Sequence, residues 1–125
     1  MLSAPMEDYL EAISLVQNAD GFSRVTDVRN LLGVKTPSVT GALRVLAEQG
    51  YVKHEPYGEV KLTAKGRRAA EDVKARHAIL SRFLTEVLGV RAKTADMDAC
   101  KMEHTISRET LEKLHTFLQK QTKRK

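Results

Sequence analysis

The stretch that decides the fold is residues 26–63, TDVRNLLGVKTPSVTGALRVLAEQGYVKHEPYGEVKLT. Its first part predicts a short helix, because Thr26 can serve as the N-cap and Gly33 can end the helix in a left-handed conformation. A second helix is predicted from Thr36 and Pro37, since a capping residue followed by proline is typical of a helix start. The stretch therefore begins as two short helices joined by a tight turn.

A β-hairpin is predicted to follow the second helix, which Gly50 ends. Residues 51–55 and 60–63 alternate between apolar and polar side chains, as two short strands do. The four residues Pro56-Tyr57-Gly58-Glu59 have the composition of the turn between such strands. Two short helices and a hairpin in this order predict a winged helix-turn-helix.

Outside this stretch the chain is predicted to be helical. The expected helices, from apolar residues at helical spacing, are residues 6–18, 64–87, 95–105 and 108–120. Gly89 is expected to end the long helix of residues 64–87, and Ser107 to cap the last helix. The fold class is therefore mainly α, with a winged helix-turn-helix domain over residues 1–68 and an all-helical domain over residues 69–125.

Charge is unevenly distributed along the chain. The 125 residues include 21 Lys and Arg against 16 Asp and Glu, a formal net charge of +5. Residues 1–23 hold four acids and no Lys or Arg, whereas residues 24–68 have a net charge of +5. Residues 69–118 are neutral overall, and residues 119–125 carry +4. The basic central region predicts a polyanionic partner, whereas the acidic N-terminal segment needs a different explanation.

Composition excludes several classes of protein. The sequence has no run of 18 apolar residues and no N-terminal secretory signal, so we expect a cytoplasmic protein with no membrane partner. Cys100 is the only cysteine, which excludes an internal disulfide. The sequence contains no nucleotide-binding loop and no nucleophile elbow, so we do not expect an enzyme.

The second helix of the central stretch is expected to contact DNA. In a winged helix-turn-helix this helix enters the major groove, and the hairpin contacts the flanking phosphates. Hydroxyl groups bond phosphate or base edges, glycine permits close approach, and arginine pairs with phosphate or guanine. The candidate contacts to a double-stranded DNA operator are Lys35, Thr36, Pro37, Ser38, Thr40, Gly41, Arg44, Lys53 and Lys61. Each of them, taken alone, is equally compatible with an ordinary solvated surface.

Two groups of possible metal ligands lie far apart in the sequence. Asp8 and Glu11 are three residues apart on the first predicted helix, so their carboxylates share one face. Cys100, Glu103 and His104 stand at positions i, i+3 and i+4, so a thiolate, a carboxylate and an imidazole project from one side of one helix. This combination of ligand types suits a single divalent cation.

The same residues also allow a structural interpretation. His77 is a further potential ligand, but it lies on an apolar stripe, where a histidine is usually a hydrogen-bonded core residue. A single cysteine is usually a small buried hydrophobic residue, and a pair of carboxylates is usually solvated. The two groups form a site only if the fold brings them together, which the spacing does not show.

Motifs along nearly the whole chain resemble one family of bacterial regulators. They are MEDYLEAI at residues 6–13, PSVT at 37–40, LTAKG at 62–66, RH at 76–77 and CKMEH at 100–104. On these motifs the chain resembles the diphtheria toxin repressor and manganese transport regulator family of metal-activated repressors. The CKMEH motif is the most specific, because the family places metal ligands there.

This resemblance implies a metal-dependent DNA-binding repressor that controls metal homeostasis genes. The implied ligands of the divalent metal are Asp8, Glu11, His77, Cys100, Glu103 and His104. The helices from residue 64 onward would form a homodimer, which makes residues 69–125 the dimerisation and metal-binding domain.

The resemblance is mixed as to the metal. The two N-terminal carboxylates resemble the manganese branch, whereas Cys100 stands where that branch has a carboxylate and the iron branch has cysteine. Because thiolate disfavours Mn²⁺ relative to Fe²⁺, we expect Fe²⁺, with Mn²⁺ second. Ser81 stands where the family often has a glutamate, and Asp96 or Asp98 could substitute for it.

Two other functions fit parts of the sequence. A winged-helix regulator that senses an organic ligand, or oxidation of the Cys100 thiol, predicts no metal response and a peroxide-sensitive thiol. An architectural protein predicts a steep salt dependence and no sequence preference.

Overall fold

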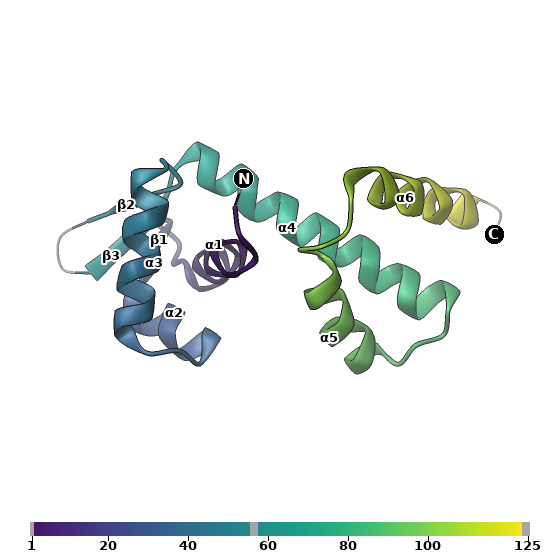
Figure 1. Cartoon of the computed structure of the whole chain (residues 1–125), viewed down its shortest axis with the longest axis horizontal. Coiled ribbons are helices and arrows are strands. Elements are labelled where there is room, and N and C mark those ends of the chain that lie inside the picture. Colours follow the sequence, from purple (N-terminus) through teal and green to yellow (C-terminus); the bar gives the residue numbers. More distant parts are fainter. Residues whose placement is uncertain (1, 56–57, 124–125) are drawn as a thin grey trace. The chain divides into compact units, whose positions relative to one another are not determined.

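The computed structural model describes residues 2–55 and 58–123 and is mainly helical (Figure 1). Its elements are α1 (Ala4–Val16), β1 (Phe22–Arg24), α2 (Val25–Leu32), α3 (Thr36–Glu48), β2 (Val52–His54), β3 (Glu59–Leu62), α4 (Ala64–Arg82), the π-helical turn η2 (Phe83–Val87), α5 (Ala92–Met102) and α6 (Arg108–Lys123). They form two compact units, Met1–Asp72 and Val73–Lys125, and the boundary falls within α4. The predicted mainly α class is confirmed. Among the described helices, none has the length and apolar character needed to cross a bilayer.

The first unit contains a three-stranded antiparallel sheet in the order β1-β3-β2. The predicted hairpin is present as β2 and β3, whose register pairs Val52 with Leu62. The sequence did not predict β1, because three residues are too few to show an alternating pattern. β1 pairs Ser23 with Val60, and the buried Ser23 hydroxyl donates to the backbone oxygen of Ile13 at 2.7 Å. The additional strand therefore ties the wing to α1.

Helix α2 begins directly where β1 ends. Arg24 has extended backbone angles and occupies the N-cap position, so the prediction of Thr26 as the cap is wrong. Gly33 ends the helix with a φ of 68°, as the sequence predicts, because this left-handed conformation is accessible to glycine at no steric cost.

Helix α3 begins at Thr36, one residue earlier than a Thr36 cap would allow. Lys35 is the N-cap, and Pro37 lies in the first turn, where its missing N–H leaves no helical hydrogen bond unmade. Of the predicted hairpin turn, residues 56 and 57 lie outside the part of the chain that the structure describes.

Helix α1 packs its apolar face into the same core as α2 and α3. Leu10 and Ile13 of α1, Val28 of α2, Leu43 of α3 and Val60 of β3 are all fully buried there. Burying a side chain of this size contributes about 1.5–3 kcal/mol to folding. Helices α1 and α3 therefore pack into one shared core.

The start of α4 is fixed by Thr63 and Gly66. The Thr63 hydroxyl lies 2.6 Å from the carbonyl oxygen of Gly50 and 3.1 Å from that of Tyr51, and it accepts from the Gly66 N–H at 3.1 Å. A Cβ atom at Gly66 would overlap the Tyr51 carbonyl oxygen and lie 3.2 Å from Cδ2 of Leu62. The LTAKG motif is therefore the junction from β3 to α4, and its last residue must be glycine because the helix lies so close to Tyr51.

The second unit has its own small core. Its buried apolar residues are Leu80, Leu84, Ala95 and Ala99. The rings of Phe83 and Phe117 meet edge to face, with their centroids 6.3 Å apart. These contacts hold η2, α5 and α6 together with the second half of α4.

The ends of the helices in this unit differ from the predicted ones. The long helix extends to Val87 as predicted, but its last five residues form a π-helical turn. α5 covers Ala92–Met102 instead of residues 95–105, because both Thr105 and Ile106 donate to the Met102 carbonyl and close a turn there. Ser107 caps α6 as predicted, by accepting from the Thr110 N–H at 3.2 Å.

The two helical glycines provide a matched test of the α4 junction. Gly66→Ala is expected to destabilise the chain by about 1–3 kcal/mol, because the methyl group has no space beside Tyr51. Gly41→Ala in α3 meets nothing within 4 Å and is expected to stabilise by about 0.5–1 kcal/mol. Urea unfolding followed by circular dichroism at a fixed protein concentration measures both. Equal changes in the two variants would contradict the close contact.

Candidate DNA interface and metal centre

The candidate DNA contacts of α3 lie away from the core of the first unit. The opposite face of α3 is buried through Val39, Leu43 and Leu46. Of the candidates, Gly41 is half-buried and the others in this segment are exposed, namely Lys35, Thr36, Pro37, Ser38, Thr40 and Arg44. The start of α3 therefore presents hydroxyl groups and cationic side chains to solvent.

Sequence reasoning missed one side chain in this region. Arg29 of α2 donates through Nη1 to the hydroxyl oxygen of Thr36 at 3.2 Å. Its Nε and Nη2 both donate to the side-chain oxygen of Asn30 at 3.4 Å. The Thr40 hydroxyl donates to the Thr36 backbone oxygen at 3.1 Å. No spacing rule links Arg29 to Thr36, because a turn separates their helices.

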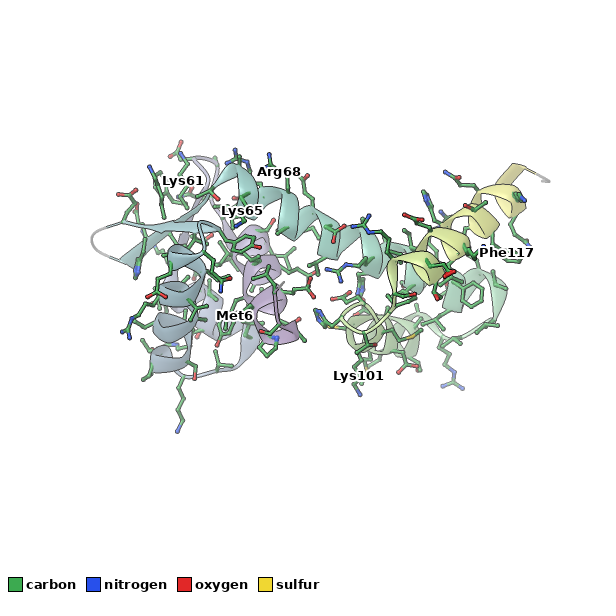
Figure 2. All side chains as sticks on the ribbon, turned by 45° about the horizontal axis from the view of Figure 1, so that its top comes forward. Met6, Lys61, Lys65, Arg68, Lys101 and Phe117 are labelled. Carbon is green, nitrogen blue, oxygen red and sulfur yellow. The ribbon has the colours of Figure 1, made fainter. Side chains whose placement is uncertain are left out.

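The wing places two candidate lysines opposite each other. Lys53 of β2 and Lys61 of β3 are directly paired across the sheet, and both are exposed (Figure 2 labels Lys61). The Lys61 ammonium group also lies over the Phe22 ring, 5.3 Å from its centroid. Like charges in this position disfavour the sheet unless an anion lies nearby. Lys65, by contrast, donates to the Gln49 carbonyl at 2.8 Å and has a structural role.

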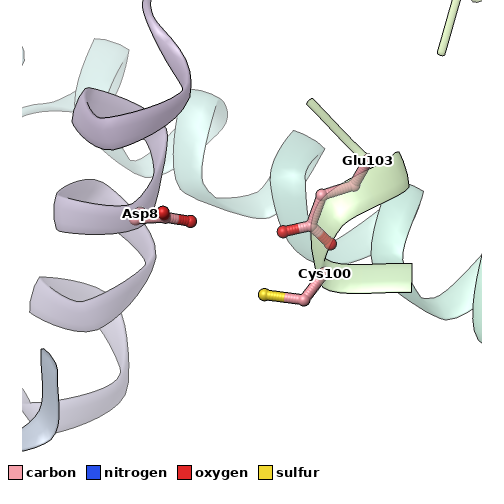
Figure 3. Close-up of side chains that lie close together, drawn as sticks. All are labelled: Asp8, Cys100 and Glu103. Atoms are coloured by element: carbon pink, nitrogen blue, oxygen red, sulfur yellow. The ribbon is translucent and has the colours of Figure 1, made fainter. Parts of the chain in front are cut away.

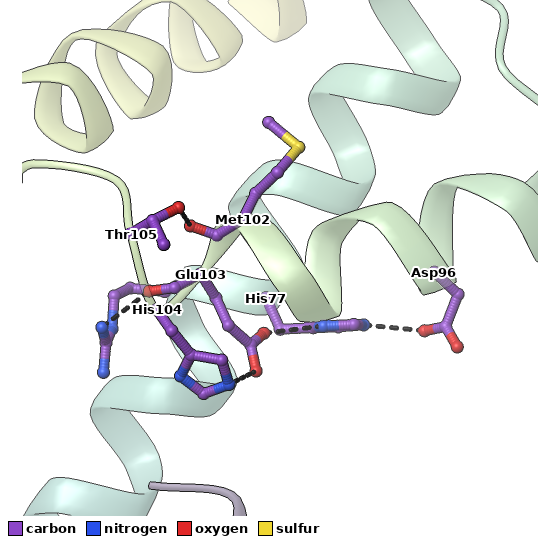
Figure 4. Close-up of polar contacts among 7 residues, drawn as sticks. His77, Asp96, Met102, Glu103, His104 and Thr105 are labelled. Carbon is purple, nitrogen blue, oxygen red and sulfur yellow. Dashed lines mark hydrogen bonds and ion pairs between the residues drawn. The ribbon is translucent and has the colours of Figure 1, made fainter. Parts of the chain in front are cut away.

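The second unit contains a network around a buried carboxylate (Figure 4). Glu103 follows α5 directly as its C-cap residue and is fully buried, with an exposed fraction of 0%. One of its oxygens lies 2.8 Å from Nδ1 of His77, and the other lies 3.5 Å from Nε2 of His104. The fold thus brings three predicted ligands together.

His77 lies between two carboxylates. Its Nε2 is 2.7 Å from an Asp96 oxygen, while its Nδ1 faces Glu103. Burial by itself lowers the pKa of His77, but hydrogen bonds and charge from Asp96 and Glu103 outweigh it and raise the pKa above 6.5. This pairing stabilises the fold most at low pH, and the contribution is lost as pH rises through the raised pKa.

The backbone of this region is held by Arg76. Its Nη1 donates to the carbonyl oxygen of Glu103 at 2.7 Å, at the C-terminal end of α5. A cation there complements the partial negative charge of a helix C-terminus. Sequence reasoning noted Arg76 and Asp96 but predicted neither the contact of Arg76 with Glu103 nor that of Asp96 with His77. Each contact joins residues that lie far apart in the sequence.

Cys100 lies one helical turn before Glu103 on α5 (Figure 3). Its Sγ and a carboxylate oxygen of Glu103 lie within 4.8 Å of each other. The predicted ligands Asp8 and Glu11 belong to the first unit, where both are half-buried on α1. Figure 3 also labels Asp8 on that helix.

The donor set of the second unit fits a divalent transition metal ion. Glu103 offers a carboxylate that is already removed from water, His77 and His104 offer imidazoles, and Cys100 offers a thiolate. Imidazole and thiolate exclude a purely hard-ion site of the Ca²⁺ type.

Two family profiles match nearly the whole chain. The profile described as the N-terminal DNA binding domain of the iron dependent repressor matches residues 1–60. The profile described as the metal binding and dimerisation domain of the iron dependent repressor matches residues 63–124.

Individual relatives agree with these profiles. An uncharacterised HTH-type transcriptional regulator of Methanocaldococcus jannaschii is 39% identical over 120 residues, which cover 95% of this chain and 96% of that protein. The transcriptional regulator MntR of Escherichia coli O6:H1 is 40% identical over 115 residues, which cover 92% of this chain and 74% of that protein. A manganese-dependent transcriptional repressor solved in complex with manganese is 32% identical with a TM-score of 0.80, over 90% of this chain and 52% of that one. This chain thus spans about half the length of that structure.

The winged helix-turn-helix that the sequence predicts is confirmed by these matches, which define a DNA-binding, metal-dependent transcriptional repressor. The chain belongs to the diphtheria toxin repressor and manganese transport regulator family. Members of this family are transcriptional regulators and not enzymes.

Proposed function

We propose that this chain represses metal homeostasis genes by binding an operator as a homodimer when it holds Fe²⁺ or Mn²⁺. The observation that carries the proposal is the fully buried Glu103 carboxylate, with His77 and His104 directed at its two oxygens. A buried carboxylate is costly unless it is paired or coordinates a metal.

The proposed ligands come from both units. His77, Cys100, Glu103 and His104 belong to the second unit, and Asp8 and Glu11 belong to α1 of the first. When bound, a divalent cation supplies the positive charge that allows these carboxylates to share one site. Without it, the carboxylates of α1 and Glu103 would repel each other if they shared this site.

The packing of α1 explains how this site controls DNA binding. Leu10 and Ile13 are buried in the same core as Leu43 of α3, so a constraint on α1 also constrains α3. Fixing α1 would then set the two α3 helices of a homodimer at the spacing of successive major grooves. A coupling of about 1–3 kcal/mol changes DNA affinity about 5- to 150-fold.

A DNA-binding titration tests this function. A fluorescent duplex selected from a random library by the metal-loaded chain is titrated anaerobically with Fe²⁺, with Mn²⁺ and with chelator. We expect the affinity to rise about 5- to 150-fold with metal. Equal affinity in metal and in chelator would show that the protein is not metal-dependent in this way.

The buried carboxylate provides the corresponding variant. Glu103→Gln keeps the shape of the side chain but removes its charge, so we expect the metal response to be lost while weak, nonspecific DNA binding remains. Glu112→Gln, at an exposed position of α6, is the matched control and should keep the response. The readouts are the metal-dependent change in anisotropy and the amount of metal bound per chain. If Glu103→Gln kept both, Glu103 would not be a ligand.

We propose that Fe²⁺ binds more tightly than Mn²⁺. The manganese regulators among the relatives support Mn²⁺ as a ligand, whereas the Cys100 thiolate favours Fe²⁺ by the general order of metal affinities.

Replacement of the thiol tests this preference. Cys100→Asp should lower the affinity for Fe²⁺ relative to Mn²⁺, because a hard carboxylate replaces the softer thiolate. Cys100→Ser removes the thiolate without adding charge and serves as the control. Competition with a chromophoric chelator under anaerobic conditions measures both affinities. An unchanged ratio in Cys100→Asp would mean that the thiol does not contact the metal.

We further propose that the exposed residues at the start of α3 and the wing lysines contact the operator. The α3 contacts are Lys35, Thr36, Pro37, Ser38, Thr40, Gly41 and Arg44, and the wing contributes Lys53 and Lys61. The pairing of Lys53 with Lys61 supports a phosphate contact, because an anion relieves their repulsion.

Neutralising one wing lysine should move stability and DNA affinity in opposite directions. Lys53→Gln should raise the stability of the free chain by about 0.2–1 kcal/mol, since it removes a like-charge pair. It should also weaken DNA binding and reduce the slope of log affinity against log salt by about 0.9. Thermal unfolding and anisotropy at several salt concentrations measure the two effects. A slope equal to that of the unmodified chain would remove Lys53 from the interface.

A further inference from the structure

The contact between Arg29 and Thr36 bears on how α3 distinguishes bases, and the inference drawn from it rests on the proposed operator contacts. A threonine hydroxyl has one O–H donor and two lone pairs, and its hydrogen normally rotates to suit its surroundings. Whether such a hydroxyl donates or accepts toward DNA is therefore usually open. At Thr36 a neighbouring side chain restricts this choice.

Arg29 directs donors at the Thr36 oxygen from within the first unit. Its Nη1 donates to Thr36 Oγ1 at 3.2 Å, so one lone pair of that oxygen is already used. The guanidinium is itself oriented, because Nε and Nη2 share the side-chain oxygen of Asn30 at 3.4 Å. Since an arginine has donors only, it cannot accept the Thr36 hydrogen. Because the charged guanidinium already donates to the oxygen, the Thr36 O–H is polarised, which favours donation over acceptance toward a second partner.

The position of Thr36 makes DNA a suitable source of that acceptor. Thr36 is exposed and is the first residue of α3, at the positive end of the helix dipole. Its own carbonyl oxygen accepts from the Thr40 hydroxyl at 3.1 Å, so the turn is held from inside the helix as well. The N-terminal residues of a recognition helix are those that reach base edges.

We propose that Arg29 is a positioning residue that makes Thr36 a hydrogen-bond donor toward the major groove. A hydroxyl held as a donor donates to guanine O6, purine N7 or thymine O4, and it discriminates against the N4 amino group of cytosine, which offers only a donor. If Arg29 is removed, both lone pairs of the Thr36 oxygen become available and the O–H is no longer polarised, so the hydroxyl can accept from cytosine as readily as it donates. Arg29 would then set specificity at one base pair of each half-site without touching DNA.

Single-base-pair substitutions in the selected duplex test this role. With the unmodified chain and MnCl₂, we expect replacement of one contacted base by cytosine to weaken binding about 5- to 150-fold, as a mismatched base pair typically does. Arg29→Met should reduce that loss to the value given by Thr36→Val, which has no hydroxyl. The double variant Arg29→Met/Thr36→Val should discriminate against cytosine as well as Thr36→Val alone does, because the two substitutions remove the same interaction. Arg29→Lys retains a donor and should restore part of the discrimination.

The salt dependence distinguishes positioning from direct contact. If Arg29 only orients Thr36, the slope of log affinity against log salt stays unchanged in Arg29→Met. If Arg29 instead neutralises a phosphate, the slope falls by about 0.9 and affinity drops equally for all duplexes, which overturns the proposal. Retention of discrimination by Thr36→Val also overturns it, even if Arg29→Met fails to fold. If the unmodified chain enriches no duplex in metal, the operator-binding function fails and this inference fails with it.

Discussion

The buried carboxylate of Glu103 is the interaction on which the polar network of the second unit, and the metal centre proposed there, depend. Because its side chain is fully buried, an isolated negative charge there would be costly, and polar partners from α4 and from the end of α5 lie around it. His77 and His104 meet its oxygens, and Arg76 holds its backbone. The small apolar core of the second unit is thus joined by a polar network that fixes how α4 meets α5. The same network arranges the donor atoms that a divalent cation requires.

Helix α1 has a corresponding double role in the first unit. One set of its side chains, including Leu10 and Ile13, belongs to the core shared with α3. Asp8 and Glu11 occupy other positions of the same three turns and remain only half-buried. Core and ligand positions therefore alternate on one short helix. A constraint applied at the carboxylates reaches the DNA-binding helix through packed side chains rather than through a flexible segment.

Much of the fold could be predicted from the sequence because its signals are local. Gly33 and the proline after Thr36 mark helix ends, and apolar residues at helical spacing identify each helix. Strand β1 and the π-helical end of α4 could not be predicted, because the first depends on pairing with β3 and the second on packing in the second unit. The observed start of α2 also differs from the predicted one, because strand β1 ends directly before it and so determines where the helix begins.

In the candidate site, too, some features could be predicted from the sequence and others could not. Spacing on one helix predicted that Cys100 and Glu103 share a side, and His77 of the long helix was a further candidate ligand that the family resemblance also implied. The contacts of His77 with Asp96 and of Arg29 with Thr36 join separate elements, so no sequence pattern indicated them. The complete ligand set and the individual DNA contacts stay predictions until the variants are measured.

The arrangement of the sheet also affects how copies of the chain can associate. With β3 in the centre, both outer strands are only three residues long, and they carry the exposed cations Arg24 and Lys53. Short edge strands offer another polypeptide chain few free backbone groups to pair with. Their charged side chains also repel the same strand of a second copy. Strand exchange and edge-to-edge aggregation are thereby disfavoured in a domain whose sheet would otherwise be open on two sides. The dimerisation domain profile matches residues 63–124, which begin after β3 and hold helices, so association would use a different kind of surface from the edges of the sheet.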